Sequence, residues 1–132
     1  MIWKTVRPSY GDIIRVKVSF YYHYGIYVDD DTVIQFGYPD NTGVKPEEIS
    51  VLVTDVFTFS CGNLCETGVC EKQEKKKRFS PEKTVARAKS RLGETGYNIL
   101  ENNCEHFVYD CAFGKEHLFF ERFTKNKTSD KS

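Results

Sequence analysis

The first sixty residues of the chain carry short apolar runs in which aromatic and β-branched residues dominate, a pattern typical of strands. Glycine, proline, asparagine and aspartate separate these runs, as they do in turns. We therefore predict four strands, at residues 11–18, 19–28, 32–36 and 49–59. Residues 60–79 show no clear period and end in the charge run EKQEKKKR, so we assign no element to them.

Helical signals begin at residue 80. Ser80 is a suitable N-cap, Pro81 fits the first helical position, and Gly93 stands where a helix closes. The apolar face of this first helix consists of Val85, Ala88 and Leu92.

A second helix is predicted at residues 104–113, with Asn102 or Asn103 as its cap and Gly114 at its end. Strands followed by helices predict an α+β fold, in which an antiparallel sheet packs against helices. We expect the His23 strand to pack against the helix that begins at Cys104.

Composition limits the possible partners. The chain has 132 residues, 39% of them hydrophobic, which suits one globular domain. Nineteen basic residues balance nineteen acidic ones, so the net charge of the chain does not favour binding to nucleic acid. Residues 29–55 are locally acidic and residues 71–89 locally basic. Solvent-exposed faces of the protein account for both charged segments. The alternative is that the acidic and basic segments surround a site, and that the basic one contacts anionic lipid head groups.

No apolar run has the length of a signal peptide, and none approaches the roughly 20 residues of a membrane-spanning helix. We therefore expect a soluble, cytoplasmic protein. The five cysteines are an odd number, and in a reducing compartment free thiols are the default.

Three of these cysteines lie within ten residues and raise the question of zinc. Cys61, Cys65 and Cys70 would need a fourth ligand such as Cys111 or a histidine, and the spacing C-x3-C-x4-C is not a standard zinc ladder. We therefore expect no metal and no other cofactor. Cys111 is interpreted as a small buried hydrophobe.

Cys104 differs from the others because it falls in the first turn of a predicted helix. Unpaired backbone N–H groups and the positive end of the helix dipole favour the thiolate there, so we expect a lowered pKa. A nucleophilic thiol also needs a base.

Only three histidines are available as that base. His106 lies about 200° around the helix from Cys104 and is interpreted as a packing or capping residue. His117 lies in the aromatic segment HLFFERF without a useful polar neighbour. His23 lies mid-strand on the same face as Gly25, whose small size leaves room for an imidazole. The alternative is a half-buried strand histidine bonded to a tyrosine.

A hairpin brings a third polar group to His23. If the chain turns through its three consecutive aspartates, Val28 pairs with Thr32 and Gly25 lies opposite Gln35. Gln35 is then a diagonal neighbour of His23 on the same face. A two-residue turn would place Gln35 on the opposite face of the sheet. Whether the thiol, the base and the amide form one site therefore depends on the pairing register of this hairpin.

The segments HYGIYVDDDTVIQF and YNILENNCEHFVYDC resemble the two signature blocks of the lecithin:retinol acyltransferase-like (LRAT-like) family, and the resemblance spans residues 8–115. This family is a branch of the permuted papain-like, NlpC-type superfamily. The resemblance implies a circularly permuted papain-like fold, with Cys104 as nucleophile and His23 as general base. Family members take an acyl chain from an ester, usually a phospholipid, as a thioester, and pass it to an amine, an alcohol or water.

Two features depart from the family pattern. Animal members usually carry a second histidine where this chain has Gln35, whose carbonyl oxygen can orient His23 but cannot transfer a proton. Many also end in a hydrophobic segment, whereas ERFTKNKTSDKS is polar. Near the nucleophile, Tyr97 and Asn103 match the pattern, and the backbone N–H of Cys104 is the better oxyanion donor.

These observations predict an LRAT-like catalytic domain at residues 1–120 and a polar, disordered tail at residues 121–132. The expected activity is that of a thiol-dependent acyltransferase or phospholipase-like acyl hydrolase acting on a lipid, with transient contact to a membrane surface. The alternatives are a cysteine peptidase or amidase, and a pseudoenzyme that binds lipid or a partner through HLFFERF and the basic run.

Overall fold

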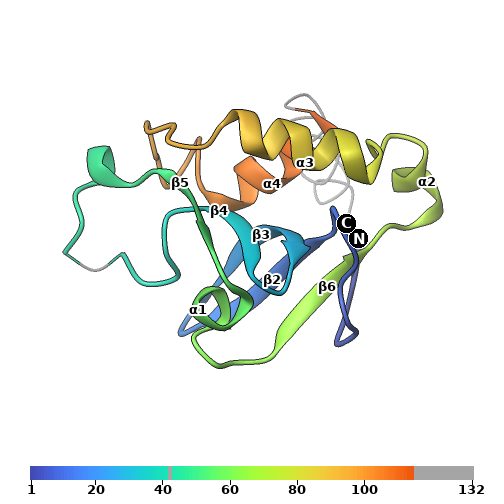
Figure 1. Cartoon of the computed structure of the whole chain (residues 1–132), viewed down its shortest axis with the longest axis horizontal. Helices are drawn as coiled ribbons and strands as arrows, with labels where there is room; N and C mark the ends of the chain where they lie inside the picture. Colours follow the sequence, from blue (N-terminus) through green and yellow to red (C-terminus); the bar gives the residue numbers. More distant parts are fainter. Residues whose placement is uncertain (42, 115–132) are drawn as a thin grey trace, which may run out of the picture.

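The computed structural model describes residues 1–41 and 43–114, and its centre is one antiparallel sheet of six strands (Figure 1). The strand order is β1-β6-β2-β3-β4-β5. The strands are β1 (Ile2–Lys4), β2 (Ile13–Val18), β3 (Tyr21–Asp29), β4 (Thr32–Phe36), β5 (Val51–Thr54) and β6 (Cys65–Val69). The predicted α+β class with helices packed on an antiparallel sheet is therefore confirmed.

Helices lie on both faces of the sheet. The helical elements are η1 (Pro46–Glu48), α1 (Val56–Ser60), α2 (Lys72–Lys75), α3 (Pro81–Ser90) and α4 (Cys104–Phe113). The longer helices α3 and α4 pack on each other and on β3, while the short helix α1 packs against β2 and β4 from the other side (Figure 1). The larger core lies under α3 and α4, and a smaller one surrounds Phe59 of α1.

The β3–β4 hairpin has the predicted pairing of Gly25 with Gln35, but its turn differs from the predicted one. Gly25 pairs with Gln35, as predicted, but Asp29 pairs with Thr32, so the turn itself has only two residues. A bulge at Val28 adds one residue to β3 and compensates for the short turn. The predicted pair of Val28 and Thr32 is therefore wrong, yet Gln35 stays on the face of His23.

Strand β1 and the short helix η1 lie in segments for which no element was predicted, and two further segments also differ from the prediction. Residues 49–59 were predicted as one strand, but β5 ends at Thr54 because Asp55 caps α1 by accepting a hydrogen bond from the Thr58 N–H at 2.6 Å. Residues 60–79, which received no element, contain β6 and α2. Strand β6 lies between β1 and β2 and pairs with both.

Arginine contacts to a buried aspartate hold α3 against α4. Asp110 of α4 is 6% exposed and accepts hydrogen bonds from Arg87 at 2.9 Å and from Arg91 at 3.0 Å. Of the predicted apolar face of α3, Val85 and Ala88 are buried, as predicted. Leu92 is 44% exposed, because α3 ends at Ser90.

Residues 115–132 are outside the described residues, and with them lie His117, the segment HLFFERF and the predicted domain boundary at residue 120. Within the part of the chain that the structure describes, no helix combines the length and the apolar character needed to cross a lipid bilayer.

Candidate active site

Cys104 is the first residue of α4, and the preceding loop holds it there by side-chain hydrogen bonds. The Asn103 side chain accepts from the His106 N–H at 3.0 Å, and the His106 Nδ1 accepts from the Asn103 N–H at 3.2 Å. This reciprocal pair is a capping box, so the predicted capping role of His106 is confirmed. Of the two predicted caps, Asn103 is the one used.

The Cys104 thiol is buried, with 8% of the residue exposed. Burial raises the pKa of this thiol, although hydrogen bonds from backbone N–H groups, that of Tyr24 foremost, act in the opposite direction. The expectation of a lowered pKa was therefore wrong, because removal from water outweighs the helix start. At rest the group is a neutral thiol.

His23 is held from behind by Gln35. The His23 Nε2 and the Gln35 Oε1 are 2.6 Å apart, and both residues are fully buried. Burial lowers the pKa of His23 to about 4, although the Gln35 contact acts in the opposite direction. The imidazole is thus neutral at pH 7, and among the described residues its Nδ1 has no hydrogen-bond partner.

The hydrogen bonds continue beyond Gln35. Its Nε2 donates to the Thr54 Oγ1 at 2.5 Å, and the Thr54 hydroxyl donates to the backbone carbonyl of Asp55 at 3.1 Å. Sequence reasoning missed Thr54. Its only available signal was a hydroxyl near the end of a predicted strand, which does not reveal a neighbour on another strand.

Gly25 has a different role from the predicted one. A Cβ at this position would lie 2.8 Å from the Phe59 ring and from the Val33 side chain. The imidazole of His23 lies against the same ring, with 5.2 Å between ring centroids. The missing side chain therefore makes room for Phe59, which supports the imidazole from behind.

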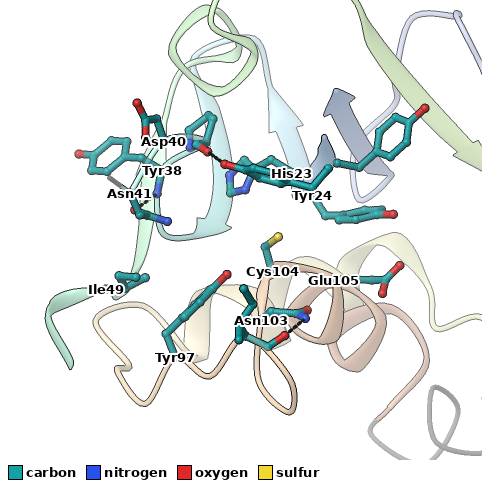
Figure 2. A pocket seen from close by; sticks show the side chains of 14 residues that line it. His23, Tyr24, Tyr38, Asp40, Asn41, Ile49, Tyr97, Asn103, Cys104 and Glu105 are labelled. Atoms are coloured by element: carbon teal, nitrogen blue, oxygen red, sulfur yellow. Dashed lines mark hydrogen bonds between the residues drawn. The ribbon is translucent and has the colours of Figure 1, made fainter. Parts of the chain in front are cut away.

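His23 and Cys104 line one cavity of about 560 Å³ (Figure 2). Several of its lining residues, at 21–24 and 38–41, lie beyond Gly25 and Gln35, the pair at which the β3–β4 ladder ends. Figure 2 shows the Cys104 sulfur pointing from α4 towards the strand that carries His23 and Tyr24. The walls are mainly aromatic and aliphatic, and they include Tyr21, Tyr22, Tyr38, Pro39, Ile49, Tyr97 and Ile99. Sequence reasoning had identified only Tyr97 among these.

Tyr97 and Tyr21 are aromatic wall residues whose contacts help to shape the cavity. Tyr97 packs edge-on against Phe36, with ring centroids 5.2 Å apart, and its hydroxyl end points into the cavity (Figure 2). The Tyr21 hydroxyl donates to the backbone carbonyl of Pro39 and so ties the loop after β4 to the start of β3.

The charged segments contribute unequally to this site. Asp40, from the acidic segment 29–55, lines the cavity, whereas no residue of the basic segment 71–89 does so. Among the described residues no cluster of three or more potential metal ligands occurs, and Cys61, Cys65 and Cys70 do not gather. Cys111 is fully buried in the larger core, as predicted.

The fold and the site define a class of α+β proteins in which a cysteine at a helix start faces a strand histidine across an apolar cavity. The family model for lecithin retinol acyltransferase matches residues 6–117. The chain belongs to this family, which confirms the resemblance seen in the sequence.

Individual relatives agree with this assignment. Lecithin retinol acyltransferase of Rattus norvegicus is 32% identical over 125 residues, which cover 79% of this chain and 54% of the relative. Phospholipase A and acyltransferase 3 of Mus musculus is 29% identical over 123 residues, or 86% of this chain and 76% of the relative. The chain thus spans about half the length of the lecithin retinol acyltransferases that it matches.

Proposed function

We propose that this protein is a thiol-dependent acyltransferase or acyl hydrolase that forms an acyl thioester on Cys104. In this proposal His23 is the general base, Gln35 orients it, and Asn103 and Tyr97 line the acyl site. The observation that carries the proposal is the shared cavity of Cys104 and His23, with the imidazole held at Nε2 by Gln35. Family membership further supports a circularly permuted papain-like, NlpC-type fold, and the match of the family model to residues 6–117 supports the proposed catalytic domain at residues 1–120.

In the first half-reaction the proton of the Cys104 thiol moves to Nδ1 of His23 as the sulfur attacks the ester carbonyl carbon. This coupling is required because both groups are neutral at rest. The carbonyl oxygen becomes an oxyanion, for which the backbone N–H of Cys104 at the start of α4 is the candidate donor. The ester C–O bond then breaks, and His23 returns the proton to the leaving alcohol.

In the second half-reaction an amine, an alcohol or water attacks the thioester carbonyl. His23 removes a proton from the acceptor, the carbon–sulfur bond breaks, and the proton goes back to the Cys104 sulfur. The neutral thiol and the neutral imidazole are thereby restored, and the balance between transfer and hydrolysis depends on which acceptor reaches the thioester.

A lipid ester is the favoured acyl donor because the cavity walls are apolar and its surroundings expose large apolar side chains. Phe20 is 98% exposed next to the wall residue Tyr21, and Leu100 is 77% exposed next to the wall residue Ile99. Exposed apolar side chains that adjoin wall residues of an apolar cavity suit transient contact with a lipid surface. The relatives' names, lecithin retinol acyltransferase and phospholipase A and acyltransferase, also support a lipid donor.

The test is intact-protein mass spectrometry after incubation with phosphatidylcholine in mixed micelles. We expect one added acyl group, removed by neutral hydroxylamine and mapped to Cys104 by peptide analysis. Cys104→Ala and His23→Gln should remain unmodified, and Cys111→Ala serves as a matched control for the loss of a buried thiol.

Three results would contradict the proposal in different ways. An adduct on Cys61 would assign the chemistry to another, exposed thiol. Cleavage of a fluorogenic peptide library without any lipid-derived adduct would support the peptidase or amidase alternative. Binding of micelles without acylation and without hydrolysis would support the pseudoenzyme.

A further inference from the structure

Three neighbouring strands each contribute one polar side chain to a chain of hydrogen bonds behind the imidazole. His23 lies on β3, Gln35 on β4 and Thr54 on β5. In the sheet register Gly25 pairs with Gln35, and Val33 pairs with Thr54. Each of the three polar residues is therefore the diagonal neighbour of the next, and all three lie on one face.

We propose that Thr54 is a positioning residue that, acting through Gln35, determines which nitrogen of His23 carries the proton. This inference rests on the proposed function, because it concerns the imidazole that serves there as the base. Thr54 itself does not line the cavity.

The backbone carbonyl of Asp55 fixes which groups in this chain of hydrogen bonds donate and which accept. The Asp55 carbonyl oxygen can only accept, and the Thr54 hydroxyl donates its single proton to it at 3.1 Å. The Thr54 oxygen is then left with lone pairs to present to Gln35. Consequently it acts as an acceptor for that side chain, at 2.5 Å.

This arrangement selects one orientation of the Gln35 amide. The NH2 group must face Thr54, so the carbonyl oxygen faces His23. The flipped amide would set its oxygen against the lone pairs of Thr54 and lose that hydrogen bond. Because Gln35 is 0% exposed, water cannot replace the lost partner.

The Gln35 carbonyl oxygen in turn requires a donor, which must be Nε2–H of His23 at 2.6 Å. A neutral imidazole carries one ring proton, so Nδ1 is left with a free lone pair. Since burial keeps the imidazole neutral, with a pKa of about 4, this tautomer is the form present at pH 7. Nδ1 can then accept the thiol proton.

The experiment compares Thr54→Val with Thr54→Ser. Valine has nearly the same shape and suits a strand, but it removes the hydroxyl, whereas serine retains it. Thr67→Val is a matched control, because Thr67 of β6 is also a strand threonine whose hydroxyl donates to a backbone carbonyl, that of Val6 at 2.8 Å, and it is buried whereas Thr54 is partly buried.

The first readout is the tautomer of His23, measured without substrate from long-range ¹H–¹⁵N correlations in protein labelled with ¹⁵N-histidine. Loss of one resonance set in His23→Gln assigns the signal among the three histidines. We expect Nε2–H in the wild type, Thr54→Ser and Thr67→Val, and a population of Nδ1–H in Thr54→Val. An Nδ1–H wild type, or an unchanged tautomer in Thr54→Val, would overturn the proposal.

The second readout is hydrolysis of p-nitrophenyl butyrate. We expect kcat of Thr54→Val to fall by about tenfold to a hundredfold with little change in KM, as for other residues that orient a reacting group. Thr54→Ser should restore kcat. If the wild type shows the expected tautomers but hydrolyses no ester, the proposed function fails while the positioning role of Thr54 stands.

Discussion

The neutral, buried imidazole of His23 predicts a specific loss of stability in acid. His23 is 2% exposed, and removal from water lowers its pKa to about 4, while the Gln35 hydrogen bond acts the other way. In the unfolded chain the group returns to its ordinary pKa of about 6.5. The folded and unfolded states therefore bind different numbers of protons between these two values.

The sign and the size of the effect follow from this difference. Above about pH 6.5 the imidazole is neutral in both states and has no effect on the free energy of unfolding. As the pH falls towards 4 the unfolded state takes up a proton that the folded state excludes, so stability decreases. At about 1.4 kcal/mol per pH unit, the loss approaches roughly 3 kcal/mol at the lower pKa and levels off below it.

The assay is urea unfolding of the wild type and of His23→Gln at pH 7 and pH 4.5. The fluorescence of Trp3, the only tryptophan, reports the transition. Glutamine retains a donor and an acceptor but does not titrate, and the other titrating groups are common to both proteins. We expect the wild type to lose about 2 kcal/mol more than the variant over this pH range.

An equal loss of stability in the two proteins would refute the reasoning. It would mean that His23 is already charged in the folded state, or that water reaches it. A lower stability of His23→Gln at both pH values would not affect the result, because only the difference between the two pH values is compared.

Three other changes give defined outcomes. Gln35→Ala should lower kcat for ester hydrolysis by about tenfold to a hundredfold, while Gln35→His should keep activity because a second imidazole can also accept from His23; complete loss in both would contradict an orienting role. Gly25→Ala should cost about 1–3 kcal/mol in urea unfolding, because the new Cβ meets neighbouring side chains at 2.8 Å; an unchanged stability would contradict this. Phe20→Asp should reduce co-sedimentation with phosphatidylcholine vesicles, whereas Val6→Asp, which is half-exposed and not part of the cavity, should not; equal binding by both would exclude Phe20 from the lipid contact.

Local signals were enough for several elements and for the cysteine. Ser80 with Pro81 begins α3, and Asn103 with Gly114 delimits α4, because a helix end needs partners for its unpaired backbone groups and only a few side chains supply them. The position of Cys104 at a helix start followed from its own segment, and the family assignment followed from that segment together with the one that contains His23.

Local sequence patterns did not predict the features that depend on contacts or pairing with other parts of the chain. The strand composition of residues 49–59 concealed the cap at Asp55 that ends β5 and begins α1. The bulge at Val28 could not be read from the sequence, because a short turn with a bulge and a longer turn without one give Gln35 the same register.

The sequence by itself determined the alternation of strands and helices and the cap that sets Cys104 at the start of α4. The bulge at Val28, which keeps His23 and Gln35 on one face despite the two-residue turn, is a feature of the tertiary structure. Only the tertiary structure decided the charge state of the site and the partner of Gln35. Burial raises the pKa of Cys104 and lowers that of His23, and burial depends on what packs around a group rather than on its neighbours in the chain. Thr54 reaches Gln35 because β4 and β5 pair in one register, which residues distant in sequence establish together.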